Sequence, residues 1–108
     1  MQTLVQVFST AGSSLREAIA DDPLLDRHAF VVSLEHKPGR KPGWLKLRSD
    51  RPDRRGVINV EWEVATHLLN CRIITKGGNR PHLIAGDFIE YLLARHRRRI
   101  QSIMIVPR

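Results

Sequence analysis

The residues of this chain best suited to bind a ligand are its arginines and lysines, which crowd into two stretches. Residues 27–55 hold nine cations against three carboxylates, and residues 80–108 hold six arginines against two carboxylates. The first 26 residues instead carry a net charge of −3, and residues 56–79 are neutral. Concentrated positive charge attracts polyanions, whereas the same charge spread evenly serves only solubility. The pattern therefore predicts an acidic partner, most readily the phosphates of a nucleic acid.

Two segments form the principal predicted site. Four arginines occupy five positions at the end of a predicted helix, more than the one or two cations that would complement the helix dipole. A basic loop is expected at the same end of the sheet, with an exposed tryptophan beside it that can stack on a base. The predicted nucleic-acid-binding residues are Lys37, Arg40, Lys41, Trp44, Arg95, Arg97, Arg98 and Arg99. The alternatives are a solvated helix end and a Trp44 buried in a second apolar face.

A secondary basic patch is predicted at the opposite end of the sheet, from Arg51, Arg54, Arg55 and Arg80. Its loop carries its own carboxylates, Asp50 and Asp53, which can pair with these arginines internally. Neither patch is expected to discriminate between base sequences, because contacts from arginine and lysine to phosphates carry affinity rather than specificity.

Local patterns predict the elements that position these residues. Thr3–Phe8 is a short Val-rich segment that reads as a strand, and Ser14–Glu17 is a capping box that begins a short helix. Alternating apolar residues predict strands over 30–36, 44–49, 57–64 and 69–76, with the last two joined by a turn near residues 65–67. Pro81 opens a long helix to about Arg97, and residues 100–106 form a final strand.

This order predicts one α+β domain over residues 1–108, with an acidic arm and short helix in residues 1–28 and the sheet and long helix in residues 29–108. The expected sheet is an antiparallel four-stranded meander with the long helix packed on it. The final strand is expected to join it parallel to residues 69–76, through a right-handed crossover.

The element order resembles the core of the restriction-endonuclease-like nucleases, which bind metal through an acid and then an acid and a lysine two residues apart. The chain offers Glu17, Asp50 or Asp53, and the pair Glu61 and Glu63, but no lysine at the required position. A metal-dependent nuclease with an incomplete active site is therefore a minor alternative.

Other catalytic signals are weak. His67 and Cys71 have ligand spacing on a helix but not on the predicted hairpin. The segment Ser9–Ser14 lacks the lysine and glycines of a phosphate-binding loop. We expect no catalytic residue, no metal and no cofactor.

Composition bounds the function. The chain has 108 residues, a formal net charge of +7, 42% hydrophobic residues and a single cysteine. No apolar run is long enough to span a membrane, no secretory signal is evident, and one cysteine suits a reducing compartment, so we expect a cytoplasmic protein. The leading hypothesis is a non-enzymatic basic domain that binds nucleic acid. The main alternative is a homodimeric interaction module that pairs through the uncovered sheet face or the edge of the last strand.

Overall fold

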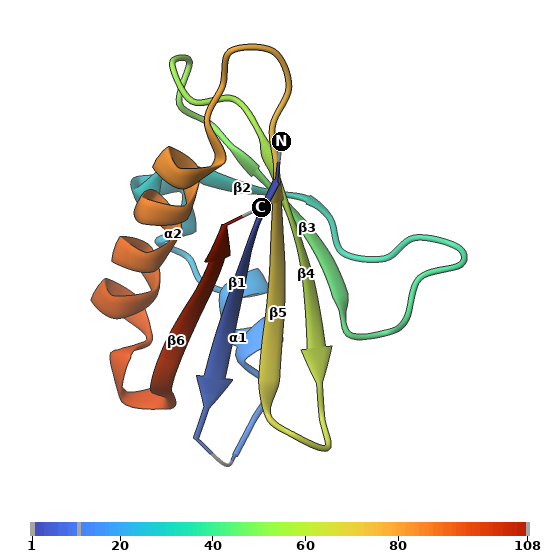
Figure 1. Ribbon diagram of the computed structural model, residues 1–108. Helices are drawn as coiled ribbons and strands as arrows, with labels where there is room; N and C mark the ends of the chain where they lie inside the picture. Colours follow the sequence, from blue (N-terminus) through green and yellow to red (C-terminus); the bar gives the residue numbers. More distant parts are fainter. Residues whose placement is uncertain (1, 11, 108) are drawn as a thin grey trace.

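The computed structural model describes residues 2–10 and 12–107 and has one sheet with its helices on one side (Figure 1). The chain runs through β1 (Gln2–Ser9), α1 (Leu15–Ala20), the 3-10 turn η1 (Leu25–His28), β2 (Phe30–Leu34), β3 (Trp44–Ser49), β4 (Val57–Glu63), β5 (Leu68–Ile74), α2 (Pro81–Arg95), the 3-10 turn η2 (Arg97–Arg99) and β6 (Ile100–Pro107). The α+β class and the order of these elements agree with the sequence prediction.

The sheet has six antiparallel strands in the order β2-β3-β4-β5-β1-β6. The prediction of four strands plus a parallel fifth was wrong, because β1 inserts between β5 and β6 and hydrogen-bonds to both. Strand β6 does run in the same direction as β5, but its neighbour is β1, to which it is antiparallel. Strand β1 supplies hydrogen-bond partners for the backbone groups of β5 and β6 that face it. Its Val5 and Val7 are fully buried on one face and extend the core.

Both helices cover the same face of the sheet, and the core lies between them. Alternation along the strands turns Val5, Leu45, Leu47 and other apolar residues toward the helices. The core face also contains Val7, Ile58, Val60, Leu69, Cys71 and Ile73, which meet Leu15 and Ile19 of α1 and Ile84, Phe88 and Leu92 of α2. The opposite face carries no helix, and we call it the open face.

Local signals at the helix ends act largely as predicted. The Ser14 side chain caps α1 by accepting a hydrogen bond from the Glu17 amide at 3.2 Å, although the Glu17 carboxylate pairs with Arg16 instead of completing the capping box. Pro81 is the first residue of α2. The buried side of α2 is formed by Ile84, Ala85, Phe88, Tyr91 and Leu92, whereas Leu93 is exposed.

Gly43 precedes β3 at a point where the backbone of β4 leaves no room for a side chain. A Cβ atom on Gly43 would lie 2.6 Å from the Trp62 carbonyl oxygen, and the Trp62 amide donates to the Gly43 carbonyl at 2.9 Å. Gly86, in the middle of α2, is exposed and has no heavy atom within 4 Å of such a Cβ.

We therefore expect Gly43→Ala to lower the free energy of unfolding by roughly 1–3 kcal/mol, because strands β3 and β4 must separate locally. Gly86→Ala, the matched control, should raise it by about 0.5–1 kcal/mol through helix propensity. Urea denaturation followed by circular dichroism measures both, and equal effects of the two substitutions would contradict the packing described for Gly43.

Candidate nucleic-acid interface

The principal predicted site does not assemble. The loop of residues 37–43 joins β2 to β3 near one edge of the sheet, whereas Arg95–Arg99 leads into β6 at the other edge (Figure 1). Strands β3 and β6 are four strand spacings apart, about 19 Å. The prediction of one seven-cation cluster was wrong, because it considered only the end of the sheet at which the two segments lie and not the strands between them.

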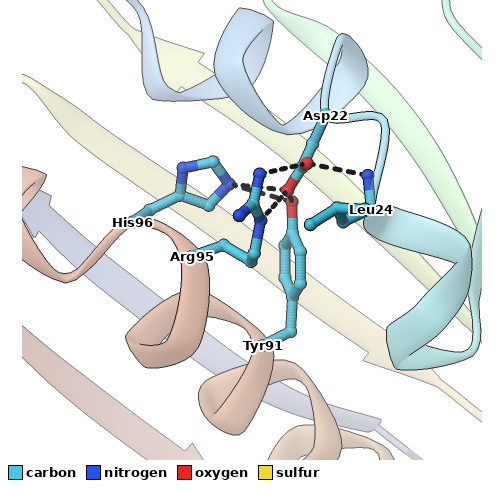
Figure 2. A network of polar contacts seen from close by, with 5 residues as sticks. All are labelled: Asp22, Leu24, Tyr91, Arg95 and His96. Atoms are coloured by element: carbon cyan, nitrogen blue, oxygen red, sulfur yellow. Dashed lines mark hydrogen bonds and ion pairs between the residues drawn. The ribbon is translucent and has the colours of Figure 1, made fainter.

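Arg95 is exposed but pairs with the buried carboxylate of Asp22 (Figure 2). The Arg95 Nη2 and Nε atoms donate to the two carboxylate oxygens at 2.9 and 3.2 Å. The Tyr91 hydroxyl donates to Oδ2 at 2.8 Å, and the Leu24 amide donates to Oδ1 at 2.9 Å. His96 Nε2 lies 2.9 Å from the Tyr91 hydroxyl and 3.4 Å from Asp22 Oδ2. These bonds fasten the segment after α1 to the end of α2.

The ionisation of this network follows from its burial. The Asp22 side chain is 1% exposed, and this burial alone would raise its pKa, but hydrogen bonds from Arg95, Leu24 and Tyr91 outweigh it and hold the pKa below the ordinary value of 3.8. Burial, and then the bond to Asp22, raise the pKa of Tyr91. Burial also lowers the pKa of His96, with Arg99 and Arg95 adding to the effect against the opposing charge of Asp22. The network therefore keeps the Asp22 carboxylate ionised and paired with the Arg95 guanidinium.

Of the four predicted arginines, Arg97 and Arg98 alone are exposed without an ion pair among the residues described. Arg99 is half-buried, and its carbonyl accepts hydrogen bonds from the Thr10 amide at 2.8 Å and from the Ser9 hydroxyl at 3.0 Å. Ser9 and Thr10 thus tie β1 to η2, while Ala11 of the segment from residue 9 to residue 14 lies outside the described residues.

Trp44 is only 2% exposed, so its predicted role as an exposed stacking platform was wrong. Its ring lies outside the main core, and the Arg40 guanidinium carbon lies 5.5 Å from the ring centroid. Arg16, itself buried, donates to the Trp44 carbonyl at 2.9 Å and to the Glu35 carbonyl at 2.6 Å. These bonds from α1 fasten both ends of the β2–β3 connection.

The secondary patch assembles but is largely neutralised. The loop before β4 and the loop before α2 meet, since the Arg55 amide donates to Asn79 Oδ1 at 3.0 Å. Asp87 of α2 pairs with Arg51 at 3.3 Å and with Arg54 at 2.7 Å, and Arg54 also lies 3.7 Å from Asp53. Arg55 and Arg80 are exposed and have no ion pair among the described residues.

The open face brings together cations that the sequence prediction did not combine. A groove of about 330 Å³ runs over its centre, lined by Leu4, Gln6, Arg40, Asn59, Glu61, Asn70, Arg72 and Ile74. Strand register places Lys46 opposite Asn59, and Asn59 opposite Arg72. Along the next row, Gln6 Nε2 donates to Asn70 Oδ1 at 3.0 Å. The centre of the sheet therefore presents cations and carboxamides side by side.

The basic surface continues past the groove. A hollow of about 300 Å³ adjoins the groove, shares Ile74 with it and is also lined by Arg55 and Lys76. A second hollow of about 500 Å³ adjoins the first, shares Arg55 with it and is also lined by Arg48. We call the whole surface the basic track. Its cations are Arg40, Lys46, Arg48, Arg55, Arg72 and Lys76, with Arg51 also lining it but paired with Asp87, and its carboxylates are Glu61 and Asp50. Alternation along β3 and β5 was the signal that located Lys46, Arg48 and Arg72 on this face.

The carboxylates of the nuclease-like pattern do not meet. Glu17 lies on α1, over the core face, whereas Glu61 is on the open face. No group of three or more His, Cys, Asp or Glu residues in the described chain could hold a metal ion. His67 lies in the turn between β4 and β5, and Cys71 is buried in the core.

Comparison of the chain with protein-family models, with curated proteins and with solved structures finds no match. No helix within residues 2–10 and 12–107 is long and apolar enough to cross a membrane.

The buried carboxylate predicts how stability depends on pH. Because folding holds the pKa of Asp22 below its ordinary value of 3.8, its stabilising contribution is complete above about pH 5 and is lost as the pH falls through the folded-state value. We expect Asp22→Asn to be less stable than wild type at pH 7 and to lose less stability between about pH 5 and pH 2.

Urea unfolding at a series of pH values measures this slope. Asp21→Asn, which removes the neighbouring exposed carboxylate, is the control and should retain the wild-type profile. An unchanged acid profile in Asp22→Asn would show that the network does not contribute through its charge.

Proposed function

We propose that this protein is a non-enzymatic nucleic-acid-binding domain that holds the phosphates of a single strand along the basic track. The observation that carries the proposal is the row Lys46, Asn59 and Arg72 on three adjacent strands, with Arg40 across the groove beside it. An uncovered sheet face that presents both cations and amide side chains suits an extended single strand of nucleic acid whose bases are unpaired.

The two kinds of side chain have separate tasks in this proposal. Arginine and lysine neutralise phosphates and release counterions, which supplies affinity. Asn59, Asn70 and Gln6 each offer both donors and acceptors, and Glu61 offers acceptors, so these side chains can hydrogen-bond base edges. With Trp44 buried and Phe8 half-buried, stacking contributes little and the binding is mainly electrostatic.

The predicted residues divide accordingly. Lys37, Arg40 and Lys41 remain part of the proposed interface, because Arg40 lines the groove and the exposed lysines lie in the same loop. Arg97, Arg98 and Arg99 belong to a separate basic cluster by β6, and Arg95 is engaged by Asp22. The track takes their place as the main phosphate-binding surface.

The test compares two double variants that remove equal charge. Lys46→Gln combined with Arg72→Gln should weaken binding to a mixed-sequence single-stranded oligonucleotide on the order of tenfold at low salt. It should also reduce the slope of log affinity against log salt by about 1.4, for two phosphate contacts of about 0.7 each. Fluorescence anisotropy from low to moderate salt measures both quantities.

Arg97→Gln combined with Arg98→Gln is the matched control, because both side chains are exposed and distant from the track. It should lower affinity less than the track variant. Equal losses of affinity in the two variants would show that net charge, and not the basic track, accounts for binding. The absence of wild-type binding to DNA and RNA at low ionic strength would refute the proposed function.

A further inference from the structure

The two edge strands of the sheet differ in how they are protected from pairing with another chain. Strand β2 has five residues and a register irregularity between Val32 and Leu34, and its apolar run ends at Glu35. Strand β6 has eight residues, Ile100–Pro107, with no charged side chain among them. Short length, bulges and charge are the devices that keep an edge from recruiting a partner strand. Strand β6 is longer than β2 and has no charged side chain, and its register irregularity lies at its start, opposite Phe8 and Ser9.

Large apolar side chains stand out on both faces of this edge. Register places Met104 opposite Gln6, on the open face, and Ile105 opposite Val5, on the helix-covered face. Met104 is 51% exposed and Ile105 is 49% exposed, and Leu93 of α2 is exposed as well. The outward backbone groups of β6 have no partner strand within the described chain. A partner must therefore supply a strand edge with apolar side chains on both faces.

We propose that β6 pairs antiparallel with β6 of a second copy of this chain, forming a two-fold dimer with a continuous twelve-stranded sheet. A second copy offers the required edge, since it carries the same uncharged strand with Met104 and Ile105 on its two faces. Antiparallel pairing of a strand with itself has the self-complementary symmetry of an isologous dimer.

Charge selects this orientation. Arg97, Arg98 and Arg99 immediately precede β6, so a parallel arrangement would bring two such clusters together. The antiparallel arrangement places them at opposite ends of the paired strands, about 27 Å apart for eight residues, which is several Debye lengths at physiological salt.

The two-fold axis of an antiparallel pair is perpendicular to the sheet, so both open faces lie on the same side of the dimer. The two basic tracks then belong to one sheet, rotated relative to each other by its twist. The proposed dimer forms through the β6 edge and does not depend on nucleic-acid binding.

The experiment measures the mass of the full chain by size-exclusion chromatography with light scattering, at moderate salt and high protein concentration. Wild type should give twice the chain mass of 12.4 kDa. Met104→Lys combined with Ile105→Lys should give 12.4 kDa, because both side chains are half-exposed in the single chain but would lie beside side chains of the other copy's β6, on the two faces of the dimer's sheet. Circular dichroism checks that this variant is folded.

Leu34→Lys combined with Val64→Lys is the matched control, since it adds the same charge at exposed apolar residues away from β6 and should remain dimeric. Hydrogen exchange of wild type gives a second readout: the outward-facing amides among residues 100–106 should gain protection as concentration rises. A wild-type mass of 12.4 kDa, a dimer that survives the β6 variant, or outward-facing amides that exchange equally at all concentrations would each overturn the proposal. Loss of nucleic-acid binding with the dimer intact would refute only the proposed function.

Discussion

The pairing of β1 with both β5 and β6 is the interaction on which the rest of this structure depends. It makes the N-terminal residues an interior strand, so that Val5 and Val7 enter the core while Leu4 and Gln6 reach the groove on the open face. It moves β6 to the outer edge, where its outward backbone groups have no partner in the described chain. It also adds one strand spacing, about 5 Å, between residues 95–99 and the loop of residues 37–43. One strand therefore shapes the core, the candidate interface and the exposed edge.

Two partly or fully buried carboxylates decide which cations are available to a ligand. Asp22 engages Arg95, and Asp87 engages Arg51 and Arg54, so three of the twelve residues predicted for the two patches are used within the fold. The centre of the basic track is different, because Lys46 and Arg72 lie on strands beside Asn59, and within the described chain only Arg48 of the track's strand cations has a carboxylate, Asp50, at 4.0 Å. The net charge of +7 therefore says less about where a ligand can bind than the positions of the carboxylates do.

Much of the fold could be predicted from local sequence. Alternation located the meander strands, and the capping serine and Pro81 located the two helix starts. The sheet order could not be obtained this way, because the alternation in Thr3–Phe8 indicates a strand without indicating its neighbours. The predicted exposure of Trp44 was also wrong, because the bonds from Arg16 that fix the loop beside it join residues 28 and 19 positions apart.

By itself the sequence determined the secondary structure, the α+β class, the helix-facing side of each meander strand and the excess of positive charge. These properties follow from short-range periodicity and from composition, so each can be established within a few neighbouring residues. Only the tertiary structure decided which strand borders which, which arginines meet Asp22 and Asp87, and that Arg72 and Arg40 share one groove with Lys46 in the neighbouring register position. These outcomes depend on contacts between residues far apart in the chain, which become neighbours only when the strands take their order in the sheet.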